Sequence, residues 1–323
     1  GARSRMSRVD VAGGPDAGLA WHFGDPVAEQ RGFDRGIGAV ALTNRGVVRV
    51  SGPDRLAWLH SLTTQRFDDL RPGESTTAYV LSPHGQIEHV MFATDDGTDL
   101  LAWTEAGQAD ALAAWLDSMR FMMRVEVSRP DLVVVWRPGD PDGRHRARQA
   151  GDSLGGHELF VSADEAARIV AEQPAGTWAH EARRIAAGVP RVGFDTDERT
   201  IPNEVGVPSL AVALDKGCYR GQETVARVHN LGRPPRRLVR LLLDGSVDEL
   251  PPPGSPLHLA DGPGGRPVGA VGTSARHHEL GPIALALVRR QTPVDAVLVA
   301  GRVAASQEAL VDPEAGLHFR PSR

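Results

Sequence analysis

Residues 215–223 read Asp-Lys-Gly-Cys-Tyr-Arg-Gly-Gln-Glu and bring unlike chemical groups together in a short space. Lys216 stands two residues before Cys218, and a nearby cation favours the thiolate form of a cysteine. Gly217 and Gly221 allow other backbone to approach closely because they carry no Cβ. The Gln-Glu-Thr that follows predicts the start of a helix, whose N-terminus would favour the thiolate further. The segment therefore predicts a reactive cysteine.

The residues alone leave a second interpretation of Cys218 open. It is the only cysteine of the chain, so it cannot form a disulfide within the chain. Free cysteines are among the side chains most often buried, where they pack as small apolar groups. On residue type alone, a buried cysteine beside a turn is the more common case.

The composition predicts a protein of several folded units that does not read nucleic acid. The chain of 323 residues is about twice as long as a usual domain, which predicts two or three units. Its aromatic content of 5% argues against a protein that stacks on bases. Its formal charge of -5 gives no overall attraction to phosphates. We therefore expect no direct binding of nucleic acid.

The sequence also predicts a cytoplasmic protein without a membrane partner. It holds no apolar run long enough to cross a bilayer and no charged-then-apolar export segment. A single cysteine fits a reducing compartment. Residues 1–5, which precede Met6, are expected to be an expression remnant outside the fold.

Patterns of apolar residues predict an α+β region followed by an all-β unit. The predicted α+β elements are a hairpin over residues 38–50, a helix over 51–62, a hairpin formed by 76–81 and 85–94, and helices over 112–119 and 178–187. Residues 138–156, rich in Gly, Pro, Asp and Arg, predict an exposed loop. The predicted strands of the second unit are residues 237–243, 267–274, 283–288 and 296–303. These patterns place the domains at residues 1–235 and 236–323.

Residues 216–223 also resemble a family signature, Lys-Gly-Cys-Tyr-x-Gly-Gln-Glu. It is typical of YgfZ-type folate-binding proteins, which are related to the glycine-cleavage T-protein, an aminomethyltransferase. The resemblance extends to residues 47–64, 272–274 and 281–288. It implies an α+β fold of two interleaved antiparallel-sheet lobes and a C-terminal β-barrel around a central folate channel. The cofactor that it implies is tetrahydrofolate or a one-carbon derivative.

The resemblance further implies support for the assembly or repair of iron–sulfur proteins, including iron–sulfur enzymes that modify tRNA. The implied partners are folate and those iron–sulfur proteins or their assembly factors. Cys218 would be the functional thiol, acting through a transient adduct, a cluster contact or a redox change.

Four residues are predicted to bind the cofactor. The resemblance implies Glu204 as the candidate for the pterin, since residues 191–204 resemble the family's Gly-x-Asp…Pro-x-Glu stretch. A carboxylate can accept two N–H bonds from the amino-pyrimidine edge of a pterin. Lys216 and Arg227 are candidates for the acidic tail, and Tyr219 is placed with them through the shared motif. Three further arginines could also meet the tail, since a planar guanidinium suits carboxylates: Arg233, Arg236 and Arg237. Each of the four arginines could equally belong to a solvated face, and the alternative for Glu204 is a solvated loop.

One departure from the T-protein pattern bears on catalysis. T-proteins carry paired aspartates in a strand where this chain has Glu88-His89. A carboxylate that is one methylene longer is displaced by about an ångström, enough to lose much of its rate effect. We therefore expect no glycine-cleavage activity.

Two other functions stay open. The first is a folate-dependent one-carbon transferase or demethylase that acts on a small amine, with Glu88 as acid or base. The second is a protein-interaction scaffold that has kept the fold and lost the ligand. No metal site is expected, because His277-His278-Glu279 are neighbours that would face opposite sides of a strand.

Overall fold

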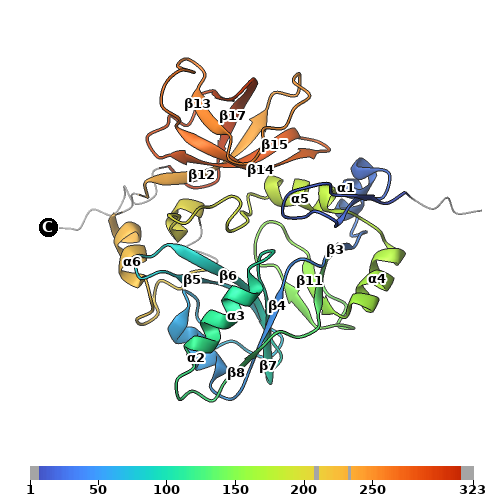
Figure 1. Ribbon diagram of the computed structural model, residues 1–323, viewed down its shortest axis with the longest axis vertical. Coiled ribbons are helices and arrows are strands. Elements are labelled where there is room, and N and C mark those ends of the chain that lie inside the picture. The colour runs from blue at the N-terminus through green and yellow to red at the C-terminus, as the bar shows by residue number, and fades with distance from the viewer. Residues whose placement is uncertain (1–6, 207–210, 232–233, 314–323) are drawn as a thin grey trace, which may run out of the picture. The chain divides into compact units, whose positions relative to one another are not determined.

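A computed structural model describes residues 7–206, 211–231 and 234–313 (Figure 1). They form a mixed α/β fold with several antiparallel sheets and a closed barrel, which confirms the predicted fold class. The chain divides into two compact units. The first unit holds residues 7–58, 67–77 and 91–183, and the second holds residues 59–66, 78–90 and the described residues from 184 onward.

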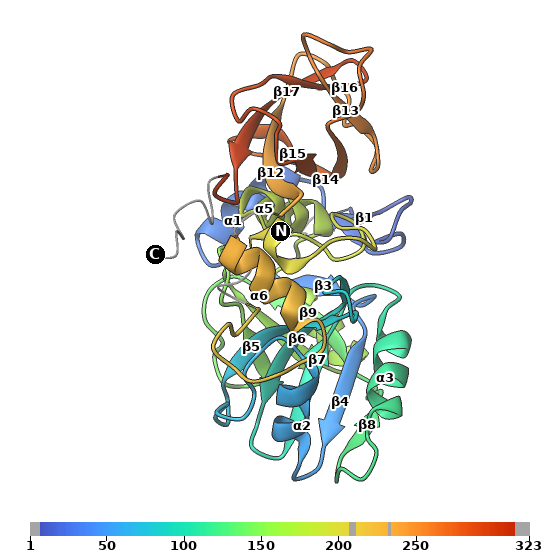
Figure 2. The ribbon, with the colours of Figure 1, turned by 90° about the vertical axis from the view of Figure 1, so that its left-hand side faces the viewer.

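The first unit is built from two sheets and a small hairpin. Its helices are α1 (Pro26–Asp34), α3 (Ala109–Ser118) and α4 (Ala163–Glu172). Its strands are β1 (Val9–Asp10), β2 (Ala20–His22), β3 (Val40–Leu42), β4 (Val47–Ser51), β7 (Asp99–Trp103), β8 (Glu126–Ser128), β9 (Val133–Arg137), β10 (Ala147–Gln149) and β11 (His157–Val161). Figure 2 shows α3 alongside β4 and β8, against which it packs.

Four elements run from one unit into the other: α2 (Arg55–Leu62), β5 (Ser75–Leu81), β6 (Ile87–Asp95) and α5 (Thr177–Ala186). They confirm the predicted helix over 51–62, the predicted hairpin over 76–94 and the predicted helix over 178–187. The order β5-β6-β7-β4-β8 forms one sheet, and β10-β11-β9-β3 forms the other. None of the helices in the described part of the chain has the length and apolar content to span a bilayer.

The core of the second sheet follows from the amphipathic pattern of α4. Ser162 caps this helix, since its side chain accepts a hydrogen bond from the N–H of Glu165. One face of the helix carries Ala166 and Ile169, which are buried with Val135 and Leu159 of the strands. The helix therefore covers the sheet through the apolar stripe that its spacing creates.

The predicted hairpin over residues 38–50 is wrong, although both of its strands exist. β3 pairs with β9, whereas β4 pairs with β7 and β8. Between them Arg45 is buried and its guanidinium lies 2.5 Å from the Asp16 carboxylate. A buried cation requires a counter-ion, so the turn is held by Asp16 and the two strands enter different sheets.

The predicted loop over residues 138–156 is also wrong in part, because it contains β10. This strand extends the sheet beside β11. Its Arg148 is 2% exposed and donates to both carboxylate oxygens of Glu158, at 3.1 and 3.0 Å, and to the Thr77 hydroxyl at 2.7 Å. The guanidinium also lies over the ring of Phe92. Arg148 thus anchors an edge strand. The strand was not predicted from the sequence because the residues around Arg148 are polar.

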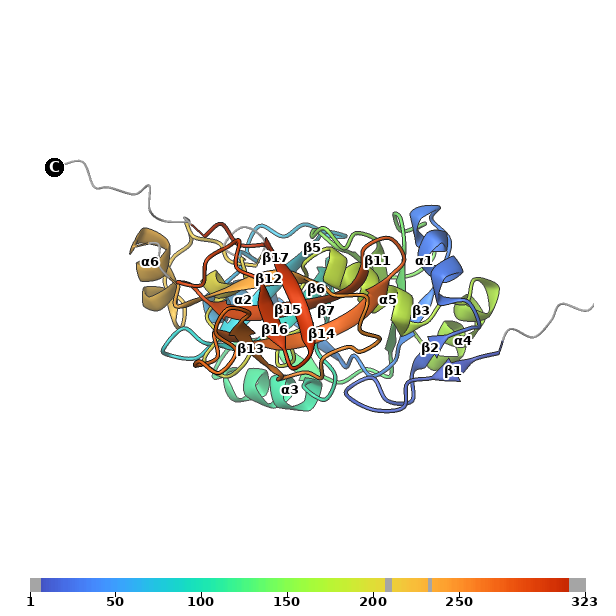
Figure 3. The ribbon, with the colours of Figure 1, turned by 90° about the horizontal axis from the view of Figure 1, so that it is seen from above.

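The second unit contains the C-terminal barrel, seen from above in Figure 3 as the orange and red strands. Its other elements are the short 3-10 helix η1 (Pro202–Val205) and α6 (Gln222–Leu231). The barrel strands are β12 (Arg236–Leu243), β13 (Pro256–Leu259), β14 (Gly269–His277), β15 (Gly281–Arg289), β16 (Leu298–Ala300) and β17 (Val303–Ala309). They close in the order β12-β15-β14-β13-β16-β17.

Alternation along β12 fills the barrel interior. Val239, Leu241 and Leu243 belong to the buried core, while the intervening Arg240 is only half-buried. Side chains of a strand alternate between its two faces, so this period of two separates core from surface. β12 begins at Arg236, but the domain boundary after residue 235 stays a prediction, as does the arrangement around a central channel.

The buried Arg148–Glu158 pair yields a stability prediction. Arg148→Met leaves the Glu158 carboxylate buried without its partner, which should lower the free energy of unfolding by about 3–5 kcal/mol. Arg302→Met is the matched control, because it removes the exposed pair of Arg302 with Glu249 and should cost less than about 1 kcal/mol. Urea denaturation followed by far-ultraviolet circular dichroism, which reports on both units, measures both variants. Equal losses in the two variants would contradict the role assigned to Arg148.

Candidate functional site

The cysteine motif lies in the second unit, in the loop that leads into α6. Gln222 is the first residue of that helix, so the predicted helix start is confirmed. Cys218 is exposed, which excludes the buried-cysteine interpretation. Gly217 has no other group within 4 Å of the position that a Cβ would take. The thiol therefore projects from an open stretch of backbone.

Two glycines allow the motif to lie against the turn between β5 and β6. A Cβ on Gly221 would come within 2.7 Å of the Ser82 carbonyl oxygen, and one on Gly85 within 2.6 Å of the Thr224 Cβ. Both glycines have positive φ, +81° and +83°, which other residues rarely adopt. The close approach predicted for Gly221 thus exists, and it fixes the start of α6 on the Ser82–Gly85 turn.

Lys216 is buried and holds the motif to the end of α2. Its ammonium donates to the backbone carbonyls of His60, Thr63 and Gln65, the latter two at 2.6 and 2.9 Å. A lysine ammonium has three N–H donors, and carbonyls at a helix C-terminus favour a cation. All three donors are therefore engaged with backbone. The role of Lys216 in binding a folate tail stays a prediction, and its contacts give it a structural role.

Tyr219 is buried beneath that lysine. The Lys216 ammonium lies 4.9 Å from the centre of its ring, a cation–π distance. Burial raises the pKa of Tyr219 to about 12, so its hydroxyl is neutral at physiological pH. Its predicted contact with the cofactor is untested, while its ring packs against the structural lysine.

Glu204 is fully buried and paired, on η1. One carboxylate oxygen accepts from Nε of Arg236 at 2.9 Å, and the other accepts from the Ile201 N–H at 3.0 Å and from Nη2 of Arg236 at 3.1 Å. The remaining contacts of Arg236 are with both carboxylate oxygens of Asp197 and with the Thr200 hydroxyl. Burial opposes the charge of Arg236, but its bonds to Asp197 and Glu204 outweigh that effect and raise its pKa. The Arg236 hydrogen bonds hold the pKa of Asp197 well below its usual range.

Two buried polar atoms near this turn have no hydrogen-bond partner among the described residues. They are Oδ1 of Asn203 and Nδ1 of His89. Asn203 is 8% exposed on η1, which packs against α6 and β12. The Ile87 N–H donates to the Thr200 carbonyl at 2.8 Å, so the start of β6 lies beside the same turn. A buried polar atom without a partner is costly, and a ligand can supply the missing bond.

The structure decides which of Glu88 and His89 faces solvent. Glu88 is exposed, and its carboxylate lies 4.0 Å from the Arg220 guanidinium of the cysteine motif. His89 is half-buried, and burial lowers its pKa against the opposing charge of Glu88. The imidazole is therefore neutral at physiological pH, and the Glu88 carboxylate is the group that the strand presents to the motif.

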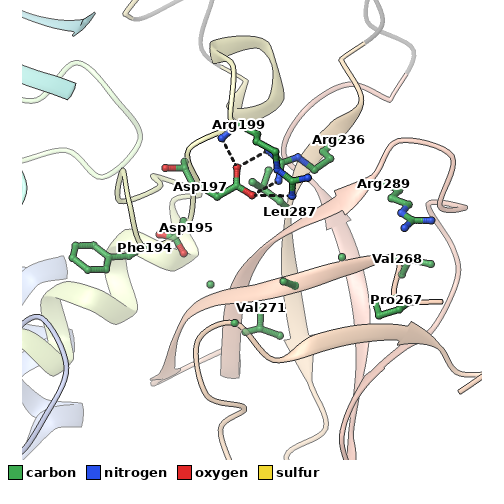
Figure 4. A pocket seen from close by; sticks show the side chains of 15 residues that line it. Phe194, Asp195, Asp197, Arg199, Arg236, Pro267, Val268, Val271, Leu287 and Arg289 are labelled. Atoms are coloured by element: carbon green, nitrogen blue, oxygen red, sulfur yellow. Dashed lines mark hydrogen bonds and ion pairs between the residues drawn. The ribbon is translucent and has the colours of Figure 1, made fainter. Parts of the chain in front are cut away.

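A cavity of about 370 Å³ lies between the segment 194–199 and the barrel strands. Figure 4 shows Arg199 and Arg236 reaching toward Asp197 on one side, with Val271 and Leu287 among the apolar lining. Asp197 pairs with Arg236 and also lies 3.6 Å from the Arg199 guanidinium, and Arg289 is the third cation of the lining. A volume of this size is typical of small-molecule sites.

The other predicted arginines do not converge. Arg227 is exposed on α6. Arg237 is 2% exposed and donates to the Thr292 carbonyl and to Oε1 of Gln307, and burial lowers its pKa. Arg233 lies outside the described residues. The predictions for Cys218, Glu88, Glu204, Lys216, Tyr219 and Arg227 as functional residues stay predictions.

Sequence reasoning missed two residues of this site, Asn203 and Arg220. Asn203 directly precedes Glu204, and only the burial of a short proline-started turn reveals that its side chain is enclosed. Arg220 occupies the variable position of the signature, where the pattern itself gives no signal. Among the described residues, no group of three or more His, Cys, Asp and Glu side chains is arranged to hold a metal ion.

Comparisons with known proteins agree with this fold. No protein-family model matches the chain. It is 32% identical over 179 residues to a protein of Edwardsiella ictaluri named tRNA-modifying protein YgfZ, covering 50% of this chain and 53% of that one. It is 24% identical over 224 residues to a mitochondrial iron–sulfur cluster assembly factor homolog of Pyricularia oryzae, covering 64% and 57%.

A solved structure matches over almost the whole chain. The glycine cleavage system aminomethyltransferase T of Bartonella henselae aligns with a TM-score of 0.76 at 17% identity, covering 94% of this chain and 93% of that one. The chain spans 60% and 63% of the length of the first curated relatives that it matches, the second of which is an aminomethyltransferase. The chain is therefore related to the YgfZ and aminomethyltransferase proteins, and it has the fold of aminomethyltransferase T.

Proposed function

We propose that the chain binds tetrahydrofolate, or a one-carbon derivative of it, and supports the assembly or repair of iron–sulfur proteins through Cys218. The relatives named for tRNA modification and for iron–sulfur cluster assembly support the cellular role. The observation that carries the proposal is the buried Asn203–Glu204 turn, which presents an unbonded acceptor next to a buried carboxylate.

The residues of the turn fit the polar edge of a pterin. A pterin carries N–H donors on its amino-pyrimidine edge, and Oδ1 of Asn203 lacks a donor. Glu204 adds carboxylate oxygens held in place by Arg236. Arg236 also lines the cavity of Figure 4, so the rest of the cofactor would find apolar walls and guanidinium groups there. When bound, the cofactor would supply one-carbon chemistry.

Cys218 is the candidate for contact with an iron–sulfur partner. Its thiol is exposed, and the motif around it is fixed by the Lys216 bonds and the Gly221 contact. A thiol held on a rigid loop can meet a partner without ordering the loop first, which reduces the entropic cost of association. A transient adduct, a cluster contact or a redox change would all require this exposure.

A second candidate function is a one-carbon transferase or demethylase acting on a small amine. The observation in its favour is the exposed Glu88 carboxylate beside Arg220 of the cysteine motif. A carboxylate in that position could exchange protons with a bound amine. The residue next to Glu88 in the strand, however, is His89, which is a neutral histidine and not a second carboxylate.

The folate proposal predicts opposite effects on stability and affinity for Asn203→Leu. The change removes an acceptor that is unbonded in the free protein, so the unfolding temperature should stay the same or rise. It also removes the bond to the pterin, which should weaken tetrahydrofolate binding about tenfold, since one hydrogen bond in a buried site is worth about 1–2 kcal/mol. Anaerobic calorimetric titration and thermal unfolding measure the two effects. Undiminished binding, or no binding by the unchanged protein, would refute the site.

The thiol proposal predicts separate effects for Cys218→Ala. Because the side chain is exposed, the change should alter stability by less than about 0.5 kcal/mol and leave tetrahydrofolate affinity unchanged. Cells that rely on the variant should lose activity of their iron–sulfur enzymes, measured as the level of an iron–sulfur-dependent tRNA modification. The matched control is Ser306→Ala, which removes an exposed hydroxyl from the same unit. Full cellular activity of Cys218→Ala would rule out the thiol.

The absence of paired carboxylates at Glu88-His89 predicts no glycine-cleavage turnover. The purified chain, supplied with tetrahydrofolate and the aminomethyl-loaded carrier protein, should form no methylene-tetrahydrofolate above the buffer rate. Product formation that is lost in Glu88→Ala would instead favour the transferase. His89→Asp tests the reason directly, because it restores a second carboxylate to the strand.

A further inference from the structure

Two large apolar side chains stand almost fully in solvent on the first unit. Phe121 is 85% exposed and Met122 is 97% exposed. They form the apex of the turn between α3 and β8, and we call this pair the Phe-Met tip. Adjacent large apolar side chains with this exposure are uncommon on a monomeric surface and typically mark an interaction site.

The backbone of the tip is strained. Phe121 has φ of 47°, and it is the only non-glycine residue with positive φ among residues 7–206, 211–231 and 234–313. For a bulky side chain this conformation is costly, and it persists only where the surroundings impose it. A glycine would adopt it without strain.

The surroundings that impose it are contacts at both ends of the turn. On one side, the Trp58 indole N–H donates to the Met119 carbonyl at 3.0 Å. On the other, the Arg124 N–H and guanidinium donate to both carboxylate oxygens of Asp54, at 2.8, 3.1 and 2.8 Å. A Cβ on Gly52 would lie 2.2 Å from the Arg124 carbonyl oxygen. The segment that starts α2 thus clamps the tip in place.

We propose that the Phe-Met tip docks into an apolar pocket on a partner protein whose rim carries carboxylates. This inference rests on the proposed function, since it takes the partner to be the iron–sulfur protein that Cys218 serves. Phenylalanine supplies a rigid anchor, and methionine adapts its shape to the pocket wall.

The rim chemistry follows from the charges that face solvent. The Arg124 side chain is 73% exposed, whereas its partner Asp54 is 23% exposed. The Arg124 cation therefore lies outside its counter-ion, whereas on the other flank Arg120, 42% exposed, pairs with Asp117, which is 55% exposed. An exposed cation beside an apolar apex complements an acidic group on the rim of an apolar pocket.

The strain favours a protein over a lipid surface as the occupant. A lipid surface accepts an apolar loop in many conformations, so a fixed and costly backbone would bring no advantage there. A pocket of fixed shape rewards a side chain that is already positioned, because less conformational freedom is lost on binding. The contacts that clamp the tip therefore hold Phe121 in the conformation that a partner pocket of fixed shape would bind.

The test compares a tip variant with a control on the same unit. The tip variant is Phe121→Gly with Met122→Ser, and the control is Ile37→Ser, which removes an apolar side chain that is 46% exposed. In the purified proteins, the tip variant should unfold at no lower temperature than the unchanged chain, because glycine relieves the strain. Calorimetry should show equal tetrahydrofolate affinity in all three proteins.

The decisive readout is made in cells that rely on each variant. The level of the iron–sulfur-dependent tRNA modification should fall in the tip variant toward that of Cys218→Ala and should stay normal in Ile37→Ser. A photo-crosslinking residue at position 122 should join the chain to an iron–sulfur protein. With that protein purified, the tip variant should bind about thirtyfold more weakly, the usual loss for an interface anchor.

The outcomes separate this inference from the function on which it rests. If Cys218→Ala loses the modification and the tip variant keeps it, the tip is not the docking element and the proposed function stands. If both variants keep the modification, the proposed function is refuted. The inference that rests on it is then refuted as well. Binding of the unchanged chain, but not the tip variant, to phosphatidylcholine–phosphatidylserine vesicles would assign the tip to a membrane and overturn the inference. Tip-dependent dimerisation in sedimentation would overturn it in favour of a second copy of the chain.

Discussion

The candidate cofactor site depends on one guanidinium group. Arg236 stands at the first residue of β12 and binds Glu204, Asp197 and Thr200, which belong to the segment that precedes the cysteine motif. A carboxylate as buried as that of Glu204 is tolerated only with a partner of opposite charge. Without Arg236, Glu204 would be a buried carboxylate without a counter-ion. The turn around Asn203 would then open, and Oδ1 of Asn203 would be exposed to water. The barrel therefore contributes to the site by delivering this arginine.

A second cation shows how the same chemistry can serve the fold. Lys216 stands near the exposed thiol in sequence, and proximity in sequence suggests that it tunes that thiol. Its ammonium instead closes the end of α2 through three backbone carbonyls. Arg220 of the same motif faces the Glu88 carboxylate. Of the two cations of the motif, one therefore holds the loop and the other remains at the surface with the thiol.

Sequence patterns predicted the helices and strands that depend only on residues close to one another along the chain. The helix over 112–119, the hairpin over 76–94 and the barrel strand that begins near Arg237 follow from local periodicity and turn residues. The hairpin over 38–50 failed because the buried pair of Arg45 with Asp16 joins residues that no local rule connects. β10 was missed because its residues are mostly polar, and its Arg148 is held by Glu158 of the neighbouring strand and by Thr77, far away in the chain. The periodicity of apolar residues shows only which face of an element a side chain occupies. It does not show ion pairs between residues that are far apart in the chain.

The residues of the candidate site also fall into those that the local sequence could predict and those that it could not. Residue type alone favoured a buried Cys218, whereas the glycine contact at Gly221 could be anticipated from residue type. The unbonded Oδ1 of Asn203 and the strained φ of Phe121 could not, because each is a conflict between a residue and its surroundings. Such conflicts concentrate where function opposes stability. Both of these residues carry a cost that the free chain does not recover, and a ligand at Asn203 or a partner at Phe121 would offset it.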